Sequence, residues 1–260
     1  MNERLKILTL LEEGKINAQE AERLLEAISG SGSAEKGGRH KIWTSLEGLP
    51  RVISVALGDA FSETAEAASQ EYPGKKVIVF KGISGDLEVR GTDRENILIE
   101  KDGFARIKEH GDSIAIKALS GNVKIAAPKK IDLVIAGVSG DISLANVNGA
   151  IDIESVSGDV TGKDLSGSLK GEIVSGDIDL DYETVDKLKI KSKNGNVILR
   201  LDEKIEAEVE IETEDGTATC DFTLIDRKKE GDKLCGIVNK AGAKIKIASA
   251  HGDVEIKKRQ

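Results

Sequence analysis

Apolar and polar positions follow a fixed nine-residue pattern across residues 136–201. Each unit begins at a glycine, and apolar residues return two, four and seven positions later. The unit from Gly140 has Ile142, Leu144 and Val147 at these positions. A spacing of two places side chains on one face of a β-strand, and glycine with polar neighbours suits a turn. The pattern therefore predicts a repeat architecture in which each unit buries its apolar face against its neighbours. The glycines that start these units are Gly140, Gly149, Gly158, Gly167 and Gly176.

Every second corner repeats the turn Ser-Gly-Asp or a close variant of it. The corner glycines from Gly85 onward, with Gly103 included, recur at nearly equal steps, and only the steps that end at Gly140 and Gly195 are longer, each by one position. We therefore predict a mainly β fold: a parallel, β-helix-like solenoid of about 18 residues per coil over residues 75–260. Each strand would pair with its equivalent one coil away, and the longer steps would be one-residue bulges. A meander of antiparallel hairpins is the structural alternative. The predicted turn residues are Gly85, Asp86, Gly121, Gly140, Asp141, Gly158, Asp159, Gly176, Asp177 and Gly195.

Residues 1–30 have helical rather than strand periodicity and predict a hairpin of two short helices. Two helices of this length cannot enclose a core alone. Their leucine faces would dock either on the rest of the chain or, as we favour, on a protein partner or a second copy. The predicted interaction residues are Leu5, Leu8, Leu11, Leu24, Leu25 and Ile28.

Residues 31–48 predict a flexible linker, because they begin with a run rich in glycine and serine. Residues 49–70 predict an amphipathic helix with Ile53, Leu57 and Phe61 on its apolar stripe. Terminal coils of a solenoid need a cap, so we expect this helix to cover one end. Contact with a membrane surface is the less favoured alternative, since Arg51 is the stretch's one basic residue.

The composition of the chain narrows the classes of function that the protein can have. The net charge of −8 and the aromatic content of 3% argue against nucleic-acid binding, which favours basic stripes with interleaved aromatics. No apolar run approaches the length needed to span a bilayer, and the N-terminus lacks the pattern of a signal peptide. We expect a cytoplasmic protein, with the cell surface as the alternative. Cys220 and Cys235 are expected as free thiols, with a disulfide as the less favoured state.

The repeated aspartates are the first candidates for chemistry. Asp86, Asp141, Asp159 and Asp177 would form a column along one corner, where calcium binding is one interpretation. Capping of backbone N–H groups is the favoured one, because asparagine replaces aspartate at two equivalent positions and supplies the same oxygen. We expect no cofactor, no metal and no catalytic residue. Acidic pairs such as Asp179 and Asp181 leave a polysaccharide-cleaving enzyme as a remote alternative.

Two stretches resemble a known family. The segment ERLKILTLLEEGKINAQEAERLLEAI, residues 3–28, resembles the SHOCT-like N-terminal domain of bacterial envelope-stress proteins of the YvlB and LiaX type. The Ser-Gly-Asp-Val repeats resemble the β-strand-repeat domain often labelled "putative adhesin". The resemblance implies a protein without enzymatic activity that is linked to cell-envelope stress. The function expected is thus a scaffold or regulatory interaction protein, with an exported adhesin or ligand-binding solenoid as the alternative.

Overall fold

The computed structural model describes residues 68–231 and 233–259, and every regular element in them is a β-strand. The predicted helical hairpin, the linker and most of the predicted amphipathic helix lie outside these residues. The prediction of a helix to residue 70 is wrong at its end, because Ala68–Tyr72 forms strand β1. This strand pairs with another strand along its length and buries Tyr72 in the core. The described residues contain nineteen strands: β1 (Ala68–Tyr72), β2 (Val77–Gly82), β3 (Leu87–Thr92), β4 (Ile97–Lys101), β5 (Phe104–His110), β6 (Ser113–Ser120), β7 (Val123–Pro128), β8 (Asp132–Ser139), β9 (Ile142–Ala145), β10 (Asn148–Ser157), β11 (Val160–Ser175), β12 (Ile178–Asn194), β13 (Val197–Leu201), β14 (Ala207–Asp215), β15 (Ala218–Cys220), β16 (Leu224–Glu230), β17 (Lys233–Val238), β18 (Ala243–His251) and β19 (Val254–Lys258).

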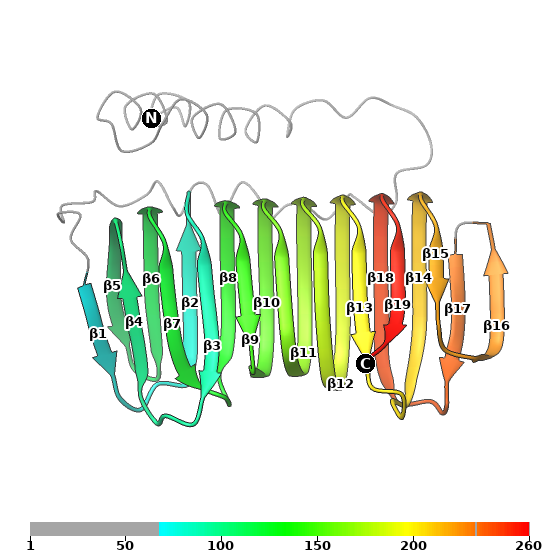
Figure 1. Cartoon of the computed structure of the whole chain (residues 1–260), viewed down its shortest axis with the longest axis horizontal. Helices are drawn as coiled ribbons and strands as arrows, with labels where there is room; N and C mark the ends of the chain where they lie inside the picture. The colour runs from blue at the N-terminus through cyan, green and yellow to red at the C-terminus, as the bar shows by residue number, and fades with distance from the viewer. Residues whose placement is uncertain (1–67, 232, 260) are drawn as a thin grey trace.

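The strands form one strongly curled, open sheet whose two halves meet at the glycine corners (Figure 1). We call the two halves the first row and the second row. The long strands β11 and β12 belong to both, since each bends between its start and its end. In spatial order the first row is β5, β6, β2, β8, β10, the ends of β11 and β12, β18, β14, β17 and β16. The second row is β1, β4, β7, β3, β9, the starts of β11 and β12, β13, β19 and β15.

Pairing in the middle of the sheet is parallel, and equivalent residues lie opposite one another. Ile151 on β10 pairs with Leu133 on β8 and with Leu169 on β11. Each of these partners lies one full repeat away in sequence. Between β11 and β12 the register slips by one residue after Gly167, so that Asp186 has no partner across the pair. This slip accommodates one longer repeat.

Two features differ from the predicted succession of coils. The β2–β3 coil lies between β6–β7 and β8–β9, and β18–β19 lies between β12–β13 and the strands β14 and β15. Pairs at both ends of the sheet are antiparallel, namely β1–β4, β4–β7, β5–β6, β14–β17 and β16–β17. The prediction that each coil stacks on the next one in sequence is therefore wrong at these places. The physical reason is that all coils present similar backbone edges and similar inward rows of aliphatic side chains. Any coil can therefore pair with any other.

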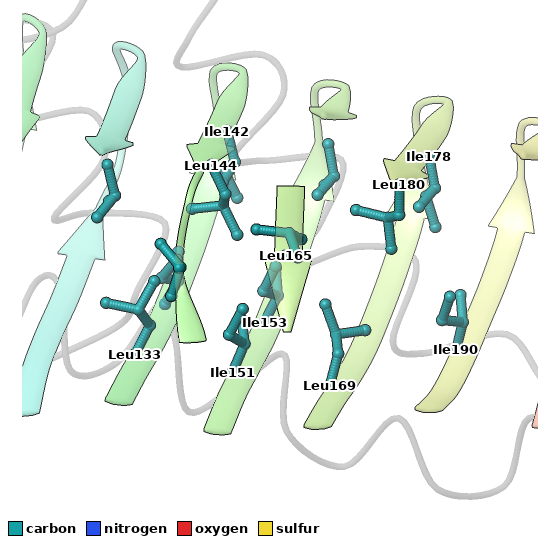
Figure 2. Close-up of a cluster of buried hydrophobic side chains, with 14 of the residues drawn as sticks. Leu133, Ile142, Leu144, Ile151, Ile153, Leu165, Leu169, Ile178, Leu180 and Ile190 are labelled. Carbon is teal, nitrogen blue, oxygen red and sulfur yellow. The ribbon is translucent and has the colours of Figure 1, made fainter. Parts of the chain in front are cut away.

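Side chains from both rows converge on a single aliphatic core (Figure 2). The expected inward orientation of Ile142, Ile151, Val160 and Ile178 is confirmed, since none is more than 4% exposed. Burial alternates along the strands, as the period of two requires. Tyr182 is the largest fully buried side chain, and burial raises the pKa of its hydroxyl. The outward-facing positions of the strands carry polar and charged side chains.

Candidate functional site

The repeated turns lie in one continuous column at the corner between the rows. The glycine backbone in this column is left-handed, with φ of +125° at Gly140, +116° at Gly158 and +137° at Gly176. Successive corners also approach closely, because a Cβ on Gly158 would lie 2.1 Å from the carbonyl oxygen of Gly140. Only glycine satisfies both conditions. In spatial order the corner glycines are Gly103, Gly121, Gly85, Gly140, Gly158, Gly176, Gly195, Gly252 and Gly216.

The Asp and Asn side chains after these glycines form a ladder of hydrogen bonds along the column. The N–H of Asp159 donates to Oδ1 of Asp141 at 2.9 Å, and the N–H of Asp177 donates to Oδ1 of Asp159 at 2.8 Å. The N–H of Asn196 donates to Oδ1 of Asp177 at 2.7 Å. These bonds are the backbone caps that the sequence favours, and the structure places them on the neighbouring coil rather than within the same turn. The remaining rungs join Asp102, Asn122, Asp86 and Asp141 at one end and Asn196, Asp253 and Thr217 at the other.

This geometry requires a side-chain oxygen and does not require a charge. We expect Asp159→Asn to leave the free energy of unfolding within about 0.5 kcal/mol of wild type, because the amide oxygen can accept the same bond. Asp159→Ala should cost about 1 kcal/mol, because the N–H of Asp177 loses its acceptor. Urea unfolding of both variants, with and without calcium, measures this difference. Equal losses in the two variants would show that the carboxylate charge matters. Among residues 68–231 and 233–259, no group of three or more His, Cys, Asp or Glu side chains is arranged to hold a metal ion.

The outward face of the first row carries charges sorted by strand. The outward positions of β12 hold Lys187, Lys189, Lys191 and Lys193, and those of β14 hold Glu208, Glu210, Glu212 and Glu214. Strand β18 lies between them and adds two lysines, Lys244 and Lys246. In the parallel register Lys187 faces Lys244, and Lys189 faces Lys246. We call this cluster of four lysines the lysine quartet.

Two adjoining hollows surround the lysine quartet. One, of about 580 Å³, is lined by the quartet, by Glu208 and Glu210 and by Cys235 and Ile237 on β17. The other, also of about 580 Å³, extends from Lys187 and Lys189 across β11 and β10 to β8 and β2. Its lining there includes Ser168, Ala150, Val134 and Val77 together with the charged residues Lys170, Asp152 and Asp132. Lys187 and Lys189 line both hollows. Together the hollows form a groove across the first row, in the size range of pockets that hold small ligands.

Ion pairs neutralise the two ends of the groove. The Nζ of Lys246 lies 2.9 Å and that of Lys233 2.6 Å from Oε1 of Glu210. Hydrogen bonds from Lys233 and then Lys246 lower the pKa of Glu210. At the other end the Nζ of Lys170 lies 3.5 Å from Oδ1 of Asp152. The middle of the groove therefore keeps its positive charge.

The profile of a known family matches most of the described sheet. It is described as "Toastrack DUF4097" and covers residues 70–257. The chain belongs to the Toastrack DUF4097 family. A second profile, described as a "SHOCT-like domain", matches residues 2–33. The sequence resemblance is therefore confirmed for its two parts, a SHOCT-like segment followed by a β-rich Toastrack domain.

Solved structures similar to the chain include three of low sequence identity. A "putative cell adhesion protein" from Clostridium sporogenes is 15% identical, with 75% of this chain and 100% of that chain covered and a TM-score of 0.41. A "putative lipid binding protein" from Parabacteroides distasonis is 13% identical, with 76% and 98% covered and a TM-score of 0.35. A "putative adhesin" from Bacteroides fragilis is 12% identical, with 74% and 98% covered and a TM-score of 0.35. A search of the curated proteins finds no match.

The Toastrack domain brings together the predicted turn residues and separates the other candidates. All ten predicted turn residues lie in the corner column. The predicted interaction residues Leu5, Leu8, Leu11, Leu24, Leu25 and Ile28 lie outside the described residues. Cys220 on β15 and Cys235 on β17 are both free thiols, and burial raises the pKa of Cys220.

The acidic pair considered for polysaccharide cleavage lies on the second row of the Toastrack domain. Arg200 forms an ion pair with Asp179. The Nε of Arg259 lies 2.8 Å from Oδ1 of Asp181. Burial raises the pKa of Asp181, while the charge of Arg259 opposes that rise. Each carboxylate thus has an arginine partner, on β13 for Asp179 and directly after β19 for Asp181.

Sequence reasoning missed the lysine quartet and the groove. The signal was present in the run Lys187 to Lys193, where lysine occupies every second position, and in the matching glutamates from Glu208 to Glu214. What was hidden is the insertion of β18 between these strands. No helix in the described part of the Toastrack domain is long and apolar enough to cross a membrane.

Proposed function

We propose that this protein is a non-enzymatic scaffold or regulatory interaction protein of the bacterial envelope-stress type to which YvlB and LiaX belong. In this proposal the Toastrack domain is a rigid platform, organised as parallel coils of the length that the corner glycines predict. Residues 1–30 form the docking module, either for a protein partner or for a second copy, and the protein works in the cytoplasm. Neither nucleic acid nor a catalytic group has a part in this role.

The continuous hydrogen-bond ladder of the corner column is the observation that supports a rigid platform. It joins consecutive corners from Asp102 to Thr217 through side-chain oxygens. These bonds run along the long axis of the sheet, as do the backbone bonds between strands (Figure 1). A sheet held in this way changes shape little when it binds, which suits a scaffold. The SHOCT-like match at residues 2–33 supports a separate module at the N-terminus.

The docking role can be tested in the full chain. We expect Leu24→Asp with Leu25→Asp to remove crosslinked complexes that the wild-type protein forms in cells, because charge disrupts an apolar docking face. The matched control is Ser31→Asp with Ser33→Asp, which adds the same charge in the predicted linker and should keep the complexes. Crosslinking followed by mass determination distinguishes self-association from a different partner. The proposal is contradicted if all three proteins give the same crosslinked species.

An exported ligand-binding protein is the second candidate function, and the groove on the first row favours it. Cell fractionation separates the two candidates. Recovery of the protein with the cell surface would support the exported form, whereas recovery with the cytosol alone would support the scaffold.

A further inference from the structure

We propose that the groove on the first row binds a phosphate-bearing amphiphile, with its phosphate between Lys187, Lys189 and Lys244. The uncharged chain of the ligand would lie toward Ala150, Val134 and Val77. This site is independent of residues 1–30, so either proposal can fail without the other.

The positive charge at the centre of the groove is not balanced by the protein. On the strand-to-strand line through Lys189, the order of outward residues is Asp152, Lys170, Lys189, Lys246 and Glu210. The outer two lysines each pair with the acid beyond them. Lys189 has a lysine on both sides and forms no ion pair within the described residues.

The adjacent strand-to-strand line, through Lys187, also carries positive charge that no acidic side chain neutralises. Its outward residues are Ala150, Ser168, Lys187, Lys244 and Glu208. Lys187 has a serine on one side and a lysine on the other. Glu208 lies across from Lys244, yet within the described chain neither lysine forms an ion pair. Like charges directly opposite on neighbouring strands destabilise a sheet, so the quartet lowers the stability of the ligand-free protein.

The spacing of these ammonium groups suits a phosphate. Neighbouring strands are about 4.8 Å apart, and alternate residues on a strand are about 6.7 Å apart. Three mobile lysine side chains on such a grid can converge on the oxygens of one dianionic group. The site differs from a flat basic surface because it is hollowed on both sides of Lys187 and Lys189.

The two ends of the groove give the ligand a direction. Toward β14, Glu208, which forms no ion pair within the described residues, would repel a further anionic group. Toward β8 the lining side chains include Ser168, Ala150, Val134 and Val77, and Val134 is 41% exposed. Two carboxylates also line this end: Asp152 forms an ion pair with Lys170, and Asp132 accepts a hydrogen bond from the N–H of Ala150. An uncharged chain that covers Val134 gains free energy from the apolar area removed from water. The groove therefore matches a ligand with a charged head and an apolar tail.

The test measures binding of decyl phosphate, below its micelle concentration, to the full-length protein by calorimetry. We expect wild type to bind it about tenfold or more tightly than inorganic phosphate, because the chain adds apolar burial. The variant Lys187→Gln, Lys189→Gln, Lys244→Gln should lose about thirtyfold or more in affinity. Its melting temperature without ligand should equal or exceed that of wild type, since repulsion is relieved. This opposite effect on binding and stability separates a binding role from a structural one.

The control variant is Lys108→Gln, Lys130→Gln, Lys163→Gln, which removes the same charge outside both hollows and should bind within about twofold of wild type. Val134→Asn should weaken decyl phosphate binding and leave inorganic phosphate unchanged. The proposal is overturned if wild type does not bind decyl phosphate, or if both triple variants lose affinity equally. Binding only to phosphatidylglycerol vesicles would also overturn it, since the site would then be a contact for a bilayer.

Discussion

Gly158→Ala is expected to destabilise the protein by about 3 kcal/mol or more. Two costs combine. The φ of +116° at Gly158 is strained for a residue with a Cβ. The added methyl would also lie 2.1 Å from the Gly140 carbonyl oxygen, and this atom is backbone that cannot rotate away. Relief of the contact requires two neighbouring coils to separate, which would break ladder bonds on both sides.

Urea unfolding and thermal melting measure this loss, with a melting temperature lower by roughly 10 °C for a domain of this size. Gly137→Ala is the matched control, because a Cβ there would contact only Ser155 Oγ, at 3.7 Å, and the backbone of Gly137 is not left-handed. We expect this control to retain wild-type stability or exceed it slightly. If the two substitutions had equal effects, close packing of the corners would not be what stabilises the sheet.

Leu180→Ala should cost about 3 to 4 kcal/mol, because it empties part of the core that no other side chain can fill. Leu180 is fully buried and lies opposite Gly162 on β11. A Cβ on Gly162 would lie 2.7 Å from Cδ2 of Leu180 and 2.5 Å from Cδ1 of Leu165. The two leucines, both labelled in Figure 2, therefore occupy the space above this glycine. Truncating one of them leaves a cavity beside a residue without a side chain.

The free energy of unfolding from urea titration measures the loss, and Val134→Ala on the outward face is the control, expected to change stability by less than about 0.5 kcal/mol. A double-mutant cycle sharpens the test. Gly162→Ala should be less costly in the Leu180→Ala protein than in wild type, because part of the obstruction is gone. Additive effects would contradict the proposed contact between Leu180 and position 162.

Local features of the fold follow from the sequence because they depend on near neighbours. The Ser-Gly-Asp corners, the strand alternation and the burial of Ile142 or Val160 are set by turn chemistry and by the period of two. The order of the strands depends on which coil pairs with which, and the coils are nearly equivalent in their backbone edges and aliphatic side chains. Hence the insertion of β2–β3 and β18–β19, like the reversed strands at the ends, could not be predicted from periodicity.

The candidate site likewise has one part that the sequence predicts and one part that it does not. The column of aspartates was predictable because it repeats with the corners, although the direction of its bonds was not. The groove was hidden because Lys187 and Lys244 lie far apart in the sequence and face each other only through the β12–β18 pairing. A charge pattern on one strand indicates an exposed face, and its meaning depends on the strands beside it.

The position of β18 and β19 has a consequence for biosynthesis. Strands β18 and β19 fill the gap between β12–β13 and β14–β15, so a chain emerging from the ribosome cannot close its sheet until residues 243–258 have been synthesised. Until then the exposed edges of β12 and β14 are open templates for aberrant pairing. We therefore expect nascent chains that stall before residue 243 to need chaperone protection, while emergence of β18 and β19 completes the sheet in a single late step.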